Sequence, residues 1–547
     1  MKKSSLFFVC LSFLSCFSPS EPLKQWEAYD ETPELAANAT HPIARMRYKR
    51  IQSKHQDRNS LFSPFEKALS RYTQADYEAV KGLILEQDIL TIQNHIAEKK
   101  LTYEALVLFY LYRIYHFETN RSTYLNALIN LNPDVLKEAR KKDAQRSKSN
   151  THPLYGMPIL LKDNIDALPM ATTAGAAALE NNFPSEDAFL VKQLKSKGAL
   201  ILGKVNMSEW AYYFCQACPL GYSAMGGQTL NPYGRKTFET GGSSSGSGVA
   251  VAANYAVAAI GSETSGSILS PSGKNSVVGL KPTIGAISRS GVIPISSSMD
   301  TAGPMTKNIL DNAILMSALI GEDQNDPYSY ASPPIDYKQL DTAHLKGKRL
   351  GVNRNFEKDS LLQNALAIMK AHGAEIIPFD PPEIKLSNFR TLLDIDMRAD
   401  LPNYLNTFAH PALGLDSIAD IVAYNQKDLL LHAPYGQEIF ERIAEENRTQ
   451  KDFSEEKKEL MLEAKAFFEE VLQQYNLDAF VSINNYSARN AAAAHYPALG
   501  VPMGYTSSGE PKNLTFIASS GSEQHLLNLG AAFERLSRSR KLPAQYH

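Results

Sequence analysis

A stretch rich in glycine and serine offers the residues for nucleophilic chemistry. Residues 240–272 read TGGSSSGSGVAVAANYAVAAIGSETSGSILSPS. A flexible linker of this composition would stay polar, whereas here two runs of alanine and valine favour burial. A serine hydroxyl needs a base to take its proton, and small residues let backbone N–H groups converge on a developing oxyanion. The stretch is therefore compatible with a serine-based site, although composition alone favours the close packing of a helix start.

Two other interpretations of this stretch are weaker. A phosphate-binding loop would need a following Gly-Lys-Ser/Thr, which is absent. Gly242–Gly246 formally matches the GxSxG elbow of α/β-hydrolases, which would make Ser244 a nucleophile assisted by His495 or His525. That elbow follows a buried strand, whereas the preceding NPYGRKTFETG is polar and rich in turn residues. We therefore do not favour a Ser-His-Asp hydrolase.

Lys162 is the alternative base. It ends the apolar run of YGMPILLKDNID. Most lysines lie on the surface, but at the end of a buried strand desolvation would lower the pKa of this amine toward neutrality. A general base at neutral pH requires such a pKa.

The surrounding pattern predicts an α/β fold. PLYGMPILLKDNID and GALILGKVN resemble buried strands, and EDAFLVKQLKSKG between them has helical spacing. Residues 248–260 are expected to form a buried helix, and KRLGVNRN and LDAFVSIN later strands. From Tyr72 to Asn120 apolar residues recur at helical spacing, with Thr102 as a helix cap. Residues 385–470 are expected to form a charged, helical insert on the substrate side, away from the Gly-rich core.

The N-terminal residues predict export. Residues 1–20 combine two lysines, an apolar stretch and a polar exit, as in a secretory signal peptide. Cys16 could carry a lipid anchor, although Phe13 and Leu14 fit that pattern poorly. Residues 21–70 are expected to form a polar, extended arm before a domain spanning 71–547.

Composition excludes several function classes. The 547 residues carry a formal charge of -2, so nothing indicates a nucleic-acid partner. The mature chain has Cys215 and Cys218 alone, too few for a four-ligand zinc site. These two could form a disulfide or remain thiols, and we assign them no catalytic role. No metal-binding cluster stands out, so we expect no metal and no cofactor.

Taken together, these segments resemble the amidase signature family. The similarity is carried by GMPILLKDNID, GGSSSGSGVAVAAN, GSETSGSILSPS and GLKPTIGAISRSGVIPISSSMDTAGPM. It covers about residues 75–330 and 475–540, with a signature core at 150–320. The resemblance implies a mixed β-sheet covered by helices in an α/β/α sandwich.

The resemblance also implies the roles of individual residues. Ser267 would be the nucleophile, Ser243 the bridging serine after a cis Gly242–Ser243 peptide, and Lys162 the base. The backbone N–H groups of residues 264–267, namely Thr264, Ser265, Gly266 and Ser267, would form the oxyanion hole. Gln228 could face the substrate or merely close a turn.

Two positions depart from the family pattern. Ser265 stands where many members have glycine, and Leu269 where arginine is common. The side chain of Ser265 would enter the acyl site and could alter substrate choice. Neither departure touches the three relay residues, so activity is expected.

The expected activity is hydrolysis of a carboxamide to a carboxylate and ammonia or an amine. The pattern is most similar to the branch with peptide amidases, so C-terminally amidated peptides are one candidate substrate. No obligatory protein partner is expected. The alternatives are a glutamine-hydrolysing amidotransferase subunit, and an inactive binding protein on the same fold.

Overall fold

Within the part of the chain that the structure describes, one mixed β-sheet of eleven strands forms the centre of the protein. The computed structural model describes residues 23–146 and 152–547, so the expected signal peptide and Cys16 lie outside the described residues. The strands are β1 (Leu128–Leu131), β2 (Pro158–Lys162), β3 (Leu200–Val205), β6 (Ala258–Glu263), β7 (Val278–Lys281), β8 (Thr301–Thr306), β9 (Arg349–Asn353), β10 (Glu375–Phe379), β11 (Ala479–Ile483), β12 (Ala498–Tyr505) and β13 (Pro511–Ile517). A separate small hairpin pairs β4 (Tyr222–Ser223) with β5 (Gly227–Gln228).

The sheet order is β1-β3-β2-β6-β8-β7-β12-β13-β11-β9-β10. Strand β2 runs parallel to both β3 and β6, and β9 runs parallel to β10 and β11. The remaining pairs are antiparallel. The expected mixed sheet is confirmed.

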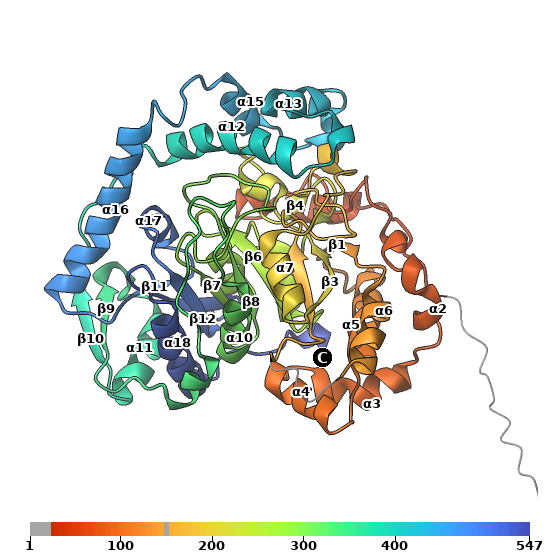
Figure 1. The fold of residues 1–547 in the computed structure, drawn as a ribbon, viewed down its shortest axis with the longest axis horizontal. Coiled ribbons are helices and arrows are strands. Elements are labelled where there is room, and N and C mark those ends of the chain that lie inside the picture. The colour runs from red at the N-terminus through yellow and green to blue at the C-terminus, as the bar shows by residue number, and fades with distance from the viewer. Residues whose placement is uncertain (1–22, 147–151) are drawn as a thin grey trace, which may run out of the picture.

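Helices cover both faces of this sheet (Figure 1). The helices are α1 (Thr32–Asn38), α2 (Glu66–Leu69), α3 (Gln74–Ile84), α4 (Ile89–Ala97), α5 (Tyr103–Glu118), α6 (Val135–Ala144), α7 (Phe189–Ser196), α8 (Ser245–Ala252), α9 (Leu269–Lys274), α10 (Ile309–Leu319), α11 (Ser360–Ala371), α12 (Phe389–Thr407), α13 (Ile418–Gln426), α14 (Leu429–His432), α15 (Glu438–Glu445), α16 (Ser454–Gln474), α17 (Ala488–Ala493) and α18 (Glu523–Ser537).

Strand β12 shows how the two layers are separated. The side chains of Leu499 and Val501 approach Gly530 of α18, whereas Gly500 between them approaches Leu269 of α9. Because successive residues of a strand point to opposite faces, α18 and α9 cover opposite sides of the sheet. Helix α8 packs beside α9, and α10 packs beside α18. This is the expected α/β/α arrangement.

The prediction of a helix over 248–260 was wrong for its second half. Helix α8 ends at Ala252, the backbone turns at Asn254 with φ +55°, and β6 begins at Ala258. A fully buried strand has no alternation of polar and apolar residues, so periodicity alone cannot distinguish it from a buried helix. The asparagine was the available signal, since it tolerates the left-handed region better than most residues.

The N-terminal segment folds onto the domain instead of extending away from it. It contains α1, α2 and short 3-10 turns, and it buries Met46, Ile51, Phe62 and Phe65. The guanidinium of Arg58 stacks over the Trp26 ring, 4.0 Å from its centroid. The segment is polar on average, so the few apolar residues that bury it against the domain were not recognised in the sequence.

Residues 385–470 are helical, as predicted. They do not lie away from the Gly-rich core, because Leu393 of α12 lines the same cavity as Ser267. Helices α12, α13 and α15 lie together at the top of Figure 1, and α16 runs down one side. The Tyr404 hydroxyl of α12 donates a hydrogen bond of 2.8 Å to Asp166, which follows β2 closely in sequence. None of the helices among the described residues is both long and apolar enough to span a membrane.

Candidate active site

The amine of Lys162 lies inside the protein and contacts two serines. Its Nζ donates hydrogen bonds to the Ser243 Oγ at 2.7 Å, the Ser262 Oγ at 2.8 Å and the Ser262 carbonyl at 3.0 Å. The side chain is fully buried. Burial lowers its pKa to about 7, although the carboxylates of Asp300 and Glu263 act in the opposite direction. A substantial neutral fraction is therefore present near neutral pH.

Sheet topology brings the lysine and the two serine loops to one edge. Lys162 ends β2, and Ser267 follows β6 by four residues. Because β2 and β6 are parallel neighbours, their carboxyl ends meet at the same edge of the sheet. Ser243 precedes α8 and follows a cis Gly242–Ser243 peptide. The Ser244 N–H donates to the Ser267 carbonyl at 3.1 Å, which joins the two serine loops.

The loop before Ser267 presents unused backbone donors. In the described part of the chain, the N–H groups of residues 264–267 donate to no other protein group. The next two N–H groups are occupied, because Ile268 and Leu269 donate to the Glu263 carboxylate at 2.6 and 2.9 Å. The Glu263 carboxylate thus holds the chain that follows Ser267 in place. Free N–H groups are what an oxyanion requires.

A cavity of about 330 Å³ opens beside this loop. Thr264, Ser265 and Ser267 line it, together with Gly242. Its other walls come from several elements, including the N-terminal arm and α12: Arg45, Ala211, Tyr212, Tyr213, Leu220, Glu239, Ser270, Lys274, Ile295, Leu393 and Asn485. The Thr264 hydroxyl donates to Asp300, whose carboxylate also accepts from the Ile295 N–H at 2.7 Å.

The other sequence candidates lie elsewhere. Gln228 is fully buried, does not line this cavity, and donates to the Leu220 and Thr229 carbonyls at 2.8 and 3.0 Å. Ser244 is also fully buried, and its hydroxyl donates to the Ser262 carbonyl at 3.0 Å. Neither His495 nor His525 hydrogen-bonds Ser244 in the described residues; the His525 Nε2 lies 3.1 Å from the Asp478 carbonyl.

Ser262 and Asp300 are contacts that sequence reasoning missed. Ser262 lies on β6 and bonds Lys162, and the Asn164 amide donates to the Ser262 Oγ at 3.0 Å. Asp163 forms a buried ion pair with Lys204, 3.2 Å between Nζ and Oδ1. The only sequence signal for Ser262 was its position near the end of an apolar run.

Among the described residues, no three His, Cys, Asp or Glu side chains are placed to hold a metal ion.

Comparison with known proteins decides the family. The family model described as Amidase matches residues 105–482. The chain belongs to the amidase family. The chain is 35% identical over 483 residues to a probable amidase of Arabidopsis thaliana, covering 84% of this chain and 92% of the relative.

Solved structures are also similar to this chain. An amidase family protein from Bacillus anthracis has a TM-score of 0.86 and 34% identity, covering 90% of this chain and 99% of that one. The peptide amidase from Stenotrophomonas maltophilia has a TM-score of 0.77 and 38% identity, covering 84% of this chain and 98% of that one. The family supports hydrolysis of amides.

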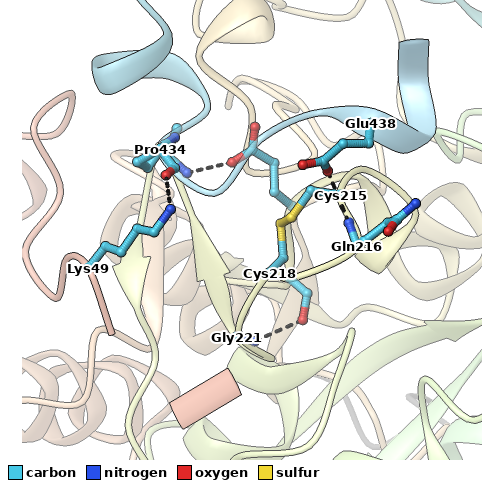
Figure 2. The surroundings of a disulfide bond; sticks show 10 residues. Lys49, Cys215, Gln216, Cys218, Gly221, Pro434 and Glu438 are labelled. Carbon is cyan, nitrogen blue, oxygen red and sulfur yellow. Dashed lines mark hydrogen bonds between the residues drawn. A yellow bond between two sulfur atoms is a disulfide. The ribbon is translucent and has the colours of Figure 1, made fainter. Parts of the chain in front are cut away.

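The two cysteines form a disulfide next to a wall of the amidase cavity. Cys215 and Cys218 are bonded, with their Cα atoms 5.6 Å apart (Figure 2). Just before them, Trp210, Ala211 and Tyr212 have φ values of +50°, +56° and +70°. Three consecutive left-handed residues are unfavourable unless neighbouring structure holds them. Glu438 accepts from the Gln216 N–H at 3.2 Å, which ties the disulfide loop to α15.

Replacing both cysteines with serine is expected to reduce stability more than catalysis. A crosslink over so short a loop contributes about 2 kcal/mol, and neither sulfur lines the cavity. The melting temperature should fall while kcat stays within about twofold of the wild type. Thermal unfolding and steady-state kinetics on one preparation measure both. A large fall in kcat would show that the loop takes part in turnover.

Proposed function

We propose that the protein hydrolyses a carboxamide through a relay of Lys162, Ser243 and Ser267. Neutral Lys162 accepts a proton from the Ser243 hydroxyl, which accepts one from Ser267. The Ser267 Oγ attacks the amide carbonyl, forming a C–O bond and an oxyanion. Support comes from the 2.7 Å hydrogen bond between the buried Lys162 amine and Ser243.

The proton then returns along the same path. Lys162 gives back its proton through the hydroxyls to the departing nitrogen, the C–N bond breaks, and ammonia or an amine leaves an acyl-enzyme. Water repeats the sequence, releasing the carboxylate and restoring Ser267. The free N–H groups of residues 264–267 would hold the oxyanion in both halves. Losing one such donor typically raises the barrier by about 3 kcal/mol.

We further propose C-terminally amidated peptides as a substrate class. The similarity to a solved peptide amidase supports this, as does a cavity large enough for a small ligand. The cavity's polar and apolar walls would suit a peptide end better than a purely hydrocarbon chain.

A panel of amides tests the activity. Purified protein is offered peptide amides, aliphatic amides, aryl amides and free glutamine, with released ammonia or amine as the readout. We expect turnover of at least one carboxamide and labelling of Ser267 by a fluorophosphonate. Turnover of glutamine alone would instead indicate an amidotransferase subunit. A folded protein with neither turnover nor labelling would indicate a binding protein.

We also propose that the protein is exported. The N-terminal sequence carries this proposal, and the disulfide supports it because such bonds persist in oxidising compartments. Cell fractionation with detection of the mature chain tests it; recovery in the cytosol with residues 1–20 intact would contradict it.

A further inference from the structure

The N-terminal arm places a charged side chain at the catalytic cavity. Arg45 lies in a short 3-10 turn, Ala44–Met46. Its guanidinium forms a two-point ion pair with Glu239, in which Nε donates to one carboxylate oxygen and Nη2 donates to the other at 2.8 Å. The side chain of Arg45 is 46% exposed, whereas that of Glu239 is 5% exposed. The buried Glu239 carboxylate therefore holds the more exposed Arg45 guanidinium in its orientation.

This ion pair is close to the reacting residues. Arg45 and Glu239 line the same cavity as Ser267, and Glu239 stands four residues before Ser243. The arm is held firmly there. The Asn38 amide donates to the Met46 carbonyl, and the Lys49 Nζ donates to the Pro434 carbonyl at 3.0 Å (Figure 2). The arm also lies outside the segment that matches the family, 105–482.

The charges of the cavity are balanced in pairs. Glu239 neutralises Arg45, and Glu510 neutralises Lys274, the other cation in the cavity wall. The cavity therefore offers no net positive charge to a carboxylate. A guanidinium has five N–H groups, and only two contacts to Glu239 are made here. Among the described residues, Glu239 is the main hydrogen-bond partner of Arg45, and the Tyr212 side chain is a further neighbour of the guanidinium.

Because Glu239 balances the charge of Arg45, the N–H groups of the guanidinium that do not bind Glu239 are suited to an uncharged hydrogen-bond acceptor. A main-chain carbonyl oxygen gains a charge-assisted hydrogen bond there. A hydrocarbon chain of the same length gains nothing and leaves the donors to water. Such a donor favours a substrate with a carbonyl oxygen in its acyl portion over one with a simple alkyl group.

We propose that Arg45, aimed by Glu239, binds a main-chain carbonyl oxygen of the acyl portion of the substrate. The enzyme then favours amides of acylated amino acids and peptides over simple amides of equal size. This inference rests on the proposed amide hydrolysis at Ser267, and it names the residue that selects the substrate class.

The test compares two matched amides. N-acetyl-leucinamide carries the carbonyl, and its hydrocarbon isostere 2-isobutylpentanamide replaces the acetamido group with methylenes. In Arg45→Gln, the glutamine amide still donates to Glu239 but the guanidinium is lost. We expect KM for N-acetyl-leucinamide to rise about tenfold, as for loss of a hydrogen bond to a charged group. We expect kcat to stay within about twofold, and the isostere to be turned over unchanged.

Arg47→Gln is the matched control. Arg47 lies in the same turn region and donates to the His41 carbonyl at 2.8 Å without lining the cavity. We expect KM and kcat of Arg47→Gln to equal those of the wild type with both amides. If Arg45→Gln does not fold, as judged by its melting curve, Arg45→Met provides the comparison, because methionine has no N–H donor.

Two outcomes would overturn the subsite. Equal losses on both amides would show that Arg45 only supports the structure, and unchanged KM on both would show that it does not contact the acyl portion. Failure of the hydrolase itself is recognised separately, because the wild type would then turn over neither amide and Ser267 would not react with a fluorophosphonate.

Discussion

Replacing Ser267 with alanine should lower kcat by about 10⁴-fold or more. The variant loses the only hydroxyl that the proposal places at the amide carbonyl, so no acyl-enzyme can form. The neighbouring free N–H groups of the loop remain, which leaves the oxyanion site intact. Ammonia release from the amide used for the wild type measures the loss, and fluorophosphonate labelling should disappear with it.

Ser247→Ala is the matched control for this loss. Ser247 belongs to the same Gly/Ser stretch, is fully buried, and donates to the Ile260 carbonyl at 3.1 Å. Its removal should cost about 1 kcal/mol of stability and leave turnover near the wild-type value. Substantial activity in Ser267→Ala would refute the assignment of the nucleophile.

Replacing Lys162 with methionine should lower kcat/KM by about 10²–10⁴-fold at neutral pH. Methionine fills a similar volume but cannot accept a proton, so the relay loses its general base. Lys307→Met is the matched control, because Lys307 is also buried with a lowered pKa but lies among Asp311 and Glu86. Its loss should spare turnover. Equal activity of the two variants would show that another group serves as the base.

The pH profile of the wild type follows from the same amine. Burial lowers the pKa of Lys162 to about 7, and only the neutral form accepts a proton. The rate constant kcat/KM should therefore be constant above about pH 8 and fall about tenfold for each unit below about pH 6. The fall in kcat/KM below about pH 6 should be absent in Lys162→Met. A wild-type profile that is flat through pH 7 would contradict a neutral lysine base.

The residues with a distinctive chemical pattern could be placed from the sequence. Lys162 at the end of a predicted strand was a candidate base, and the resemblance to the amidase signature family placed it in one site with the two Gly/Ser loops; the structure brings Lys162 and Ser243 into contact. The parallel pairing of β2 and β6 explains why. The residues around them were harder to predict. Ser262 contacts Lys162 only because β6 starts after the turn at Asn254, which the expected helix over 248–260 obscured.

The cavity walls could be predicted only in part: the insert over 385–470 was expected on the substrate side, and Leu393 of its helix α12 lines the cavity. Arg45, Tyr213 and Leu393 come from three distant segments, and tertiary packing alone brings them to one cavity. Their local sequence is typical of a surface turn, a loop and a helix. Gln228 illustrates the opposite case: its loop was singled out, but its amide is used in hydrogen bonds to the neighbouring backbone.

The position of the N-terminal arm has a consequence for how this enzyme could diversify. The arm supplies part of the cavity wall, while the lysine and both serines lie on or beside the central sheet. One proposed determinant of acyl-chain selection, Arg45, is thus encoded apart from the residues proposed to break the C–N bond, and the two stretches of the gene can change independently. A chimera carrying a relative's arm on this sheet should acquire a new preference among amides while retaining its turnover of small ones.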